Sequence, residues 1–478
     1  MWNPEGYVIE PHGAESYEIS DDGTVWTFKL HDNIRFQTGY DPVGPRDGTL
    51  LTAADVKYSL EKIMGLIDGF VSARSGWMKE FVDIARDDHG LVVVDDRTIE
   101  IHMVQPFAGL ANILTIGYSS IYPEGTTRDD LLMRPYGAGP WVLKEFQRGS
   151  VWTYERNRDY FNPSRPYLDV YQHVNIRGTE VTQSAFLTNQ IDLHDGWPTP
   201  DNESLYEKLT ADGKVRNQPY TAQQGGSTGC RPQGLNMNMY KPPFDNKELR
   251  QAVNLAIDRE AYTQVVHYGN AIPHLFLETG GMGRTVEEIS DMPGYRQPHD
   301  ADLAEAQAIM DRLYPNGLDV EMKTRDSSTY MRQGEFLAGE LRKIGINVTI
   351  NIMNSAQLFP LAQAGNYELW NYYFCQTTGT PAELMGSYFI TSGSRNWLGG
   401  YSNPDIDSGY LDMAGTMDPA ERKAKAIALE DIVMDDLPIA PLPVHTSVYN
   451  IWDYIKDVPV TSTFYTMRKI ENVWRDDS

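Results

Sequence analysis

The stretch YELWNYYFCQTTGTPAELMGSYF, from Tyr367 to Phe389, gathers the side chains of this sequence that are best suited to hold an organic ligand. Aromatic rings offer flat faces on which a ligand stacks, and amide side chains both donate and accept hydrogen bonds. A buried strand is the alternative, because alternate residues of such a strand face a core. We therefore expect half of the cluster in a core and half in a ligand cleft. The candidates for ligand contact are Trp370, Asn371, Tyr373, Phe374 and Gln376.

Catalytic motifs are missing from the sequence. It contains no GxSxG elbow, Walker loop, HExxH or dinucleotide glycine fingerprint, and its ten histidines show no metal-binding spacing. Adjacent acids such as Asp129-Asp130 and Asp435-Asp436 have the chemistry of an acid–base pair. In a chain with 66 acidic and 41 basic residues, however, adjacent carboxylates arise by composition alone. The sequence favours a binding protein over an enzyme, with no cofactor and no metal.

Composition narrows the class of protein further. A formal charge of −25 repels nucleic-acid backbones and anionic lipid, so neither is an expected partner. The sequence has no apolar run of about 18 residues, the length that a membrane-spanning helix needs. Two cysteines, Cys230 and Cys375, exclude a cysteine-built zinc or iron–sulfur site and leave one disulfide or two buried thiols. The first residues show no secretion signal.

The elements that position these side chains begin with hairpins and a short helix. Residues 15–36 alternate in polarity around the turn DDG, and residues 91–103 do so around Asp95-Asp96, so both predict hairpins. Between them, residues 50–65 predict a helix in which Thr52 caps the start and Asp55 completes a capping box. Two further predictions are a hairpin that joins 141–147 to 151–157 and a helix-to-strand segment at 181–193.

The second half of the chain predicts longer helices. A helix starts near Asp245 and Glu248, again in a capping-box arrangement, and carries an apolar stripe of Leu249, Ala252, Val253, Ala256 and Ile257. Residues 317–353 predict a strand–helix–strand unit, which forces a parallel pair of strands. A helix capped by Asp418 and an apolar strand at 439–444 follow. With 478 residues, the chain is expected to be an α/β protein of two or three lobes.

Several of these stretches together resemble one family, the bacterial solute-binding proteins of family 5, the oligopeptide and dipeptide type. The stretches WTFKLHDNIRF and DGTLLTAADVKYSLEKI are similar to the family's first block, and YGAGPWVLKEFQRGSVWTYERNRDYF is similar to the next. LNMNMYKPPFDNKELRQAVNLAIDREA, GGYSNPDIDSGYLDMA and LPIAPLPV follow in the family's order. The resemblance covers nearly the whole chain. Such proteins are extracytoplasmic receptors of ABC importers.

The resemblance implies a periplasmic-binding-protein fold of type II with an extra accessory lobe. The first main lobe is expected from residues 1–24, 140–238 and 445–478, the accessory lobe from 25–139 and the second main lobe from 239–444. Two main lobes then close over a solute, and the hinge strands are expected near Leu235–Met239 and Ile439–Val444. Four prolines, at 242, 243, 441 and 443, would stiffen these crossings.

Three departures from the family pattern matter. Family members carry a segment before IEPHGAESYEI, so we expect a sequence that is truncated at its N-terminus. Peptide-binding relatives place an aspartate just after the aligned cysteine, to pair with the ligand's ammonium group, whereas Thr377 stands there in this chain. Some relatives also bridge two cysteines at the positions of Cys230 and Cys375. A disulfide between these two would fit an oxidising compartment, and separate thiols remain the alternative.

The leading hypothesis is a monomeric receptor in the periplasm or anchored to the membrane as a lipoprotein, which delivers an oligopeptide-like solute to the permease and ATPase subunits of an importer. An oligosaccharide is the close rival, because a neutral site rich in rings and amides also fits sugars. From another class, a hydrolase would use a carboxylate pair in the same cleft. Thr377 joins the ligand-binding candidates, together with Trp197 from the first lobe and Trp397 as part of a lid.

Overall fold

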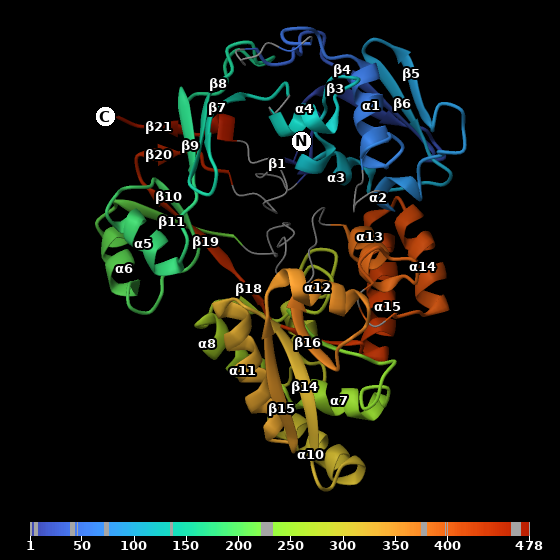
Figure 1. Ribbon diagram of the computed structural model, residues 1–478, viewed down its shortest axis with the longest axis vertical. Coiled ribbons are helices and arrows are strands. Elements are labelled where there is room, and N and C mark those ends of the chain that lie inside the picture. The colour runs from blue at the N-terminus through green and yellow to red at the C-terminus, as the bar shows by residue number, and fades with distance from the viewer. Residues whose placement is uncertain are drawn as a thin grey trace. The chain divides into compact units, whose positions relative to one another are not determined.

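The chain forms two compact units (Figure 1). The structure is a computed structural model that describes residues 2–3, 8–38, 44, 46–70, 76–133, 137–220, 233–373, 380–396, 398, 400–459 and 470–477. The first unit comprises Met1–Tyr220 and Ser447–Ser478, and the second comprises Thr221–Thr446, so the chain passes between them twice. The expected boundaries of the first and second main lobes stay predictions. The separate accessory lobe stays a prediction.

The first unit is built from several small sheets. A four-stranded sheet has the order β3-β4-β6-β5, and two three-stranded sheets have the orders β7-β8-β9 and β10-β19-β11. The remaining strands form the pairs β1-β2 and β20-β21. The strands are β1 (Trp2–Asn3), β2 (Val8–Ile9), β3 (Ala14–Ile19), β4 (Val25–Leu30), β5 (Leu91–Asp95), β6 (Thr98–His102), β7 (Trp141–Gln147), β8 (Val151–Arg156), β9 (Val170–Val174), β10 (Leu193–Asp195), β11 (Val215–Tyr220), β19 (Ser447–Trp452), β20 (Ile455–Lys456) and β21 (Trp474–Arg475).

Short helices pack against the four-stranded sheet and against the sheet β10-β19-β11. The predicted hairpins β3-β4, β5-β6 and β7-β8 are all confirmed as antiparallel pairs. The predicted helix-to-strand segment at 181–193 is confirmed as α5 followed by β10. The helices of the unit are α1 (Ala53–Ile63), α2 (Gly76–Lys79), α3 (Leu110–Leu114), the 3₁₀ turn η1 (Gly117–Ser119), α4 (Arg128–Met133), α5 (Thr179–Leu187), α6 (Glu203–Ala211) and the 3₁₀ turn η4 (Ile470–Asn472).

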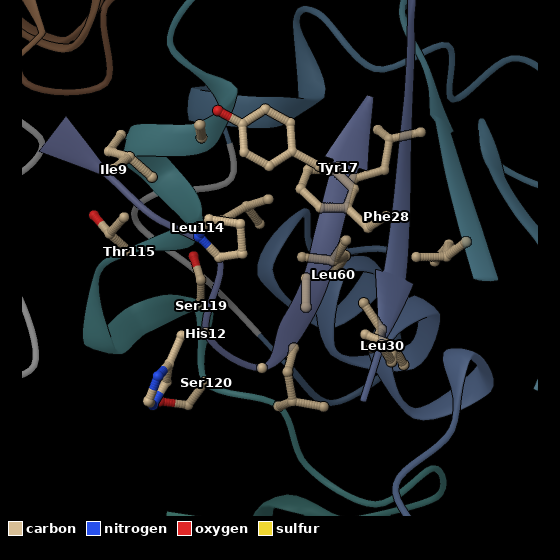
Figure 2. A pocket seen from close by; sticks show the side chains of 18 of the residues that line it. Ile9, His12, Tyr17, Phe28, Leu30, Leu60, Leu114, Thr115, Ser119 and Ser120 are labelled. Carbon is tan, nitrogen blue, oxygen red and sulfur yellow. The ribbon is translucent and has the colours of Figure 1, made fainter. Parts of the chain in front are cut away.

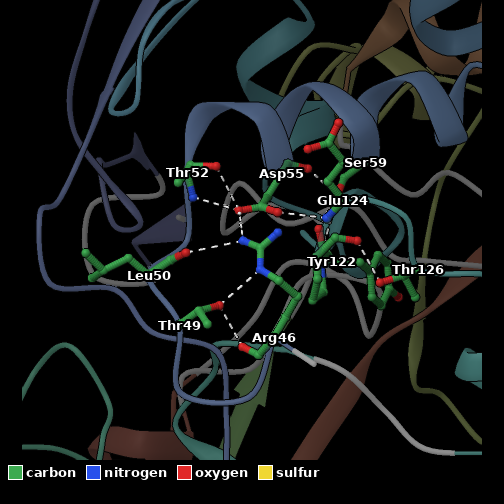
Figure 3. Close-up of polar contacts among 10 residues, drawn as sticks. Arg46, Thr49, Leu50, Thr52, Asp55, Ser59, Tyr122, Glu124 and Thr126 are labelled. Carbon is green, nitrogen blue, oxygen red and sulfur yellow. Dashed lines mark hydrogen bonds and ion pairs between the residues drawn. The ribbon is translucent and has the colours of Figure 1, made fainter. Parts of the chain in front are cut away.

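The start of α1 confirms the predicted cap and shows a further function of its acidic residue. Asp55 is fully buried, and its Oδ2 accepts hydrogen bonds from Thr52 N at 2.8 Å and from Arg46 Nη2 at 2.9 Å. Its Oδ1 accepts a third from Glu124 N at 2.7 Å. Figure 3 shows these contacts converging on the one carboxylate. Asp55 therefore fastens two loops to the first turn of α1, beyond capping the helix.

A five-stranded sheet of order β15-β14-β16-β12-β17 organises the second unit. Strands β14, β15 and β16 are parallel, β12 is antiparallel to both of its neighbours, and β17 therefore runs in the direction of β16. The predicted strand–helix–strand unit is confirmed as β14, α11 and β15. The strands are β12 (Gln233–Met237), β13 (Ala271–Ile272), β14 (Leu318–Arg325), β15 (Ile346–Met353), β16 (Leu369–Tyr373), β17 (Ile439–Leu442) and β18 (Val444–His445), with β13 and β18 forming a separate pair.

Helices cover both faces of this sheet. Side chains of α7, α8, α10 and α11 share one apolar core with one face, and α12 covers part of the other face with a smaller cluster. Along β14 buried and partly exposed residues alternate, so one face of the sheet is covered less completely than the other. The helices are α7 (Lys247–Ala256), α8 (Arg259–His267), α9 (Val286–Ser290), α10 (Asp300–Leu313), α11 (Ser328–Arg342), α12 (Ser355–Gln363), α13 (Pro381–Leu384), the π-helical turn η3 (Met385–Phe389), α14 (Pro404–Gly415) and α15 (Pro419–Asp436).

One predicted cap is wrong. The residue that caps α7 is Asn246, whose side chain accepts hydrogen bonds from Glu248 N and Leu249 N, and Asp245 lies one position before it. The apolar stripe of α7 is confirmed, because all five of its predicted residues are fully buried. The predicted cap of α15 is also confirmed, since Asp418 accepts from Glu421 N at 2.8 Å.

Candidate functional site

The carboxyl edge of the five-stranded sheet is the place where the second unit brings its candidate residues together. The strands β14, β16 and β17 end at this edge, at Arg325, Tyr373 and Leu442, and the antiparallel β12 begins there at Gln233. Ligands of open α/β sheets bind outside the carboxyl ends of the strands, because the following loops and helix N-termini converge there. We call this set of chain ends the carboxyl edge.

A buried hydrogen-bond cluster underlies the carboxyl edge. The Oε1 atom of Gln233 accepts hydrogen bonds from the Tyr262 hydroxyl at 2.6 Å and from the Gln333 amide, and it lies 3.2 Å from His267 Nε2. Gln233, Tyr262 and Gln333 are each at most 6% exposed. The backbone of Gln233 also pairs with Tyr373 and with Leu442. The side-chain amide of Gln233 thus links the start of β12 to the helices α8 and α11.

The charge of His267 is set by its position beneath this edge. Burial, followed by the positive charge of Arg332, lowers the pKa of His267 to about 4. The ring is therefore neutral at pH 7, and a neutral imidazole that donates from Nε2 to Gln233 has its other ring nitrogen free of a proton. The same ring stacks on His445, with centroids 5.4 Å apart. The side chains that contact Gln233 Oε1 are accordingly uncharged, and the positive charge of Arg332 acts on them from outside the cluster.

A second group links the strand β16 to the helix that follows β14. Asn371 is 1% exposed, and its Nδ2 donates to the carbonyl oxygen of Tyr330 at 3.0 Å. The ring of Tyr330 in turn lies 5.3 Å from the guanidinium carbon of Arg325, the last residue of β14. Asn371 thus supports the edge from inside the unit, and Arg325 supplies a positive charge at the edge itself.

Trp370 belongs to the core of the second unit. It is 1% exposed, and its ring stacks on that of Tyr372 with centroids 4.3 Å apart. Leu358 and Ala362 of α12 complete this cluster. Odd and even residues of β16 therefore face opposite sides of the sheet, Asn371 toward α11 and Trp370 toward α12. Trp370 and Tyr372 therefore belong to the half of the aromatic cluster that was expected in a core. A direct contact between Trp370 and a ligand stays a prediction.

The other predicted contacts of the second unit lie outside the described residues. These are the side chain of Tyr373 and the whole of Phe374, Gln376, Thr377 and Trp397, as well as both cysteines of the expected disulfide. The described part of β16 ends at Tyr373, so the predicted ligand segment starts directly at the carboxyl edge. Their roles stay predictions.

Trp197 lies in the first unit, on the turn that follows β10. Its carbonyl oxygen accepts a hydrogen bond from Gln183 Nε2 at 3.1 Å, while Gln183 Oε1 accepts from Asn202 Nδ2 at 2.8 Å. On the other side, Asn450 Nδ2 donates to the carbonyl oxygen of Gly196 at 2.8 Å. Gln183 and Asn450 are fully buried, so two amides hold this turn in one conformation. Trp197 itself is half-buried.

Sequence reasoning missed Gln233, His267 and Arg325. A signal for Arg325 was present, because it ends the strand of the predicted strand–helix–strand unit, where ligand-binding residues gather. Gln233 and His267 carried no comparable signal, since the cluster depends on which strand lies between β16 and β17. Among the residues that the structure describes, no group of histidine, cysteine and acidic residues is arranged to hold a metal ion.

Comparison with known proteins identifies the family. The sequence model described as "Bacterial extracellular solute-binding proteins, family 5 Middle" matches residues 8–396. The chain belongs to this family. It is accordingly a solute-binding receptor of an ABC importer and has the fold of type II periplasmic binding proteins. No helix in the described ranges is both long and apolar enough to cross a membrane.

Individual relatives agree with this assignment. The glutathione-binding protein GsiB of Escherichia coli strain K12 is 25% identical in an alignment that covers 91% of this chain and 80% of that protein. The periplasmic binding protein DppA from Helicobacter pylori, solved with the peptide STSA, aligns with a TM-score of 0.79 at 22% identity, over 98% of this chain and 90% of that one. The murein tripeptide binding protein MppA of Escherichia coli gives 0.79 at 19% identity, with the same coverage.

Proposed function

We propose that this receptor binds a short peptide or peptide-like solute through a free carboxylate, at the carboxyl edge of the second unit. The observation that carries the proposal is the position of Arg325. Arg325 is the last residue of β14 at this edge, and its guanidinium carbon lies 5.3 Å from the centroid of the Tyr330 ring. A guanidinium offers a carboxylate two parallel hydrogen bonds, which gives orientation as well as attraction.

The same reasoning accounts for the absence of an aspartate at position 377 in the sequence. A receptor that recognises an ammonium group needs a counter-charge for it, because an unpaired buried charge is costly. Thr377 supplies none. Recognition through the solute's carboxylate removes that requirement and is compatible with relatives named for binding glutathione and peptides.

Calorimetric titration with matched solutes tests the proposal. The panel pairs tripeptides with their C-terminal amides and includes glutathione. We expect the free acids to bind at least tenfold more tightly than the amides, and Arg325→Gln to abolish that difference. Arg342→Gln, an exposed arginine at the far end of α11, is the control and should change neither affinity. Equal binding of acids and amides, or an Arg325→Gln variant that keeps the preference, would contradict the proposal.

The rival solute and the rival class of protein are tested in the same experiment. An oligosaccharide was expected to stack on exposed rings, but two rings of the predicted cluster, Trp370 and Tyr372, are buried in the core. Cello- and xylo-oligosaccharides therefore belong in the panel as expected non-binders. Recovery of the solute chemically intact after long incubation supports a receptor that delivers its cargo unchanged. Cleavage products would support the hydrolase.

The setting follows from the same proposal. The receptor acts as a monomer outside the cytoplasm, in a periplasm or tethered to a membrane, and passes its solute to the permease and ATPase subunits of an importer.

A further inference from the structure

A second arginine of the second unit, Arg395, carries a charge that no acidic side chain pairs with. It is half-buried in the loop between η3 and α14, and its Nη1 donates to the Tyr388 hydroxyl at 3.0 Å. In the described part of the chain this is the one hydrogen bond of the guanidinium, and no ion pair includes it. The chain has 66 acidic and 41 basic residues, so acidic partners are abundant, and the lack of one at Arg395 calls for an explanation.

The backbone around Arg395 is braced by the π-helical turn η3. Arg395 N donates to the carbonyl oxygen of Ser387 at 2.9 Å, and the neighbouring Asn396 Nδ2 donates to the carbonyl oxygen of Ile390 at 3.0 Å. A Cβ atom at Gly393 would lie 2.7 Å from the Ser387 carbonyl oxygen, so the loop is packed directly on η3. A group that is held in place before a ligand arrives loses less conformational entropy when the ligand binds.

The charge of Arg395 acts on residues at both ends of the predicted ligand segment. Burial opposes this charge, and Tyr388, Glu383 and Tyr372 favour it, so the pKa of the guanidinium is raised overall. Tyr372 is the next-to-last residue of β16, and Glu383 belongs to α13. Arg395 is therefore charged at pH 7, within electrostatic reach of residues that bracket 374–379 in the sequence.

The register of the sheet brings Arg325 to the same place. Lys323 of β14 is level with Trp370 of the parallel strand β16. Continued for two residues, this register brings Arg325 level with Tyr372, and neighbouring strands lie about 4.8 Å apart. Tyr372 is thus next to Arg325 across the sheet and within the electrostatic reach of Arg395. Two guanidinium groups are therefore associated with one residue at the carboxyl edge.

The open pocket of the first unit offers an anion no such partner. Its lining is mainly apolar, includes Glu10, and contains neither lysine nor arginine among the described residues (Figure 2). The hydroxyl groups of Ser119 and Ser120 donate to the carbonyl oxygens of Ile113 and Gly117, both at 2.6 Å. An anionic group of a solute finds no cationic partner in this pocket.

We propose that Arg395 is a second carboxylate-binding group of this receptor, so that its preferred solutes are short peptide-like molecules with an acidic side chain besides the free carboxylate bound by Arg325. This inference rests on the proposed function, because it adds a second contact to the solute at the carboxyl edge. A guanidinium binds a carboxylate through two parallel hydrogen bonds. A half-buried cation without a counter-charge also gains more from an anionic partner than a fully hydrated one does.

Calorimetric titration with tripeptides that differ in one side chain tests the proposal. The panel places glutamate or glutamine at each of the three positions, with the C-terminal carboxylate free or amidated. We expect glutamate to bind at least tenfold more tightly than glutamine at one position. Arg395→Gln should abolish that difference and keep the preference for a free C-terminal acid. Arg395→Lys keeps the charge without the two parallel donors, so it should retain part of the glutamate preference, and it serves if the first variant does not fold.

Arg422→Gln is the matched control. Arg422 is also half-buried, and its Nη1 donates to neutral groups, the carbonyl oxygens of Thr416 and Met417, at 2.7 and 3.0 Å. It follows α14, whereas Arg395 precedes that helix. This variant removes the same charge from the same unit and should leave the glutamate preference unchanged. A loss of the preference in both variants would show that the net charge of the unit sets it, and would overturn the assignment to Arg395.

The outcomes separate this inference from the proposed function. Equal binding of glutamate and glutamine peptides by a protein that still prefers free C-terminal acids overturns the role of Arg395 alone. So does an Arg395→Gln variant that keeps the glutamate preference. A glutamate preference that depends on Arg395, with equal binding of C-terminal acids and amides, supports Arg395 and contradicts the contact at Arg325. No binding of any tripeptide overturns both.

Discussion

At the scale of single residues, Glu278 is a buried carboxyl group without a counter-charge. It is 5% exposed, and its Oε1 has no hydrogen-bond partner among the described residues. A Cβ atom at Gly281 would lie 2.9 Å from its Oε2, so the following loop closes tightly over it. Burial raises the pKa of Glu278 from 4.5 to about 8. The carboxyl group is therefore mainly protonated at pH 7 in the folded protein.

This shift predicts a loss of stability in mild alkali. In the unfolded chain Glu278 ionises near pH 4.5, and in the folded protein near pH 8. Its contribution to the free energy of unfolding is thus fully present below pH 4.5 and is lost as the pH rises to 8, by up to roughly 5 kcal/mol. Urea unfolding of Glu278→Gln between pH 5 and 9 should give a flatter curve than the unmodified protein.

A nearby exposed residue controls for the change of charge. Glu287→Gln, on the first turn of α9, should follow the unmodified protein at every pH. If Glu278→Gln and the unmodified protein instead lose stability in parallel between pH 5 and 9, the ionisation of Glu278 is not linked to folding.

At the scale of elements, the contacts of the buried Asp55 at the start of α1 predict that a conservative substitution at this residue strongly lowers the free energy of unfolding. Asp55→Asn removes the negative charge beside Arg46 and replaces one acceptor oxygen by a donor, which then faces either the donors of Thr52 and Arg46 or the backbone N–H of Glu124. Arg46 is 30% exposed, so water screens part of its attraction to Asp55. We therefore expect Asp55→Asn to lower the free energy of unfolding by about 2 to 4 kcal/mol, as measured by chemical denaturation.

The matched control for this prediction is Asp130 at the start of α4. Its Oδ2 accepts from Thr127 N at 2.8 Å, as Asp55 accepts from Thr52, but Asp130 is half-buried whereas Asp55 is fully buried. Asp130→Asn should lower the free energy of unfolding by about 1 kcal/mol or less. Equal losses for the two variants would mean that Asp55 acts as a cap alone and does not fasten the two loops.

Features that depend on a local sequence pattern were predicted correctly, whereas features that depend on the strand order and covering of the sheet were not. Thr52, Asp55 and Asp418 were identified as caps because the geometry of a helix start is local. Asp245 and Asn246 are adjacent, and both residue types are good caps. Only the exact first residue of α7 distinguishes them, and the sequence does not define it. For β16 the alternation of residues correctly predicted two opposite faces of the strand. Both faces are buried, however, and only the positions of the covering helices show that Trp370 faces α12. The cluster around Gln233 depends on strand order, which no local pattern contains.

At the scale of the whole molecule, the two units differ in how the chain builds them. The second unit is one continuous stretch, Thr221–Thr446, with its own apolar core. We expect the fragment 221–446 to unfold cooperatively in urea with an intact five-stranded sheet, as followed by circular dichroism and hydrogen exchange. A fragment that exchanges all of its amides at the rate of an unfolded chain would show instead that this core depends on the first unit.

The first unit depends on its last segment, because β19 lies between β10 and β11 and pairs with both. On the ribosome, residues 221–446 can therefore finish folding while β10 and β11 still wait for the strand that joins them. Chain growth at 5–20 residues per second makes that wait many seconds long. During this time two unpaired strand edges are exposed to proteases, to chaperones and to other nascent chains.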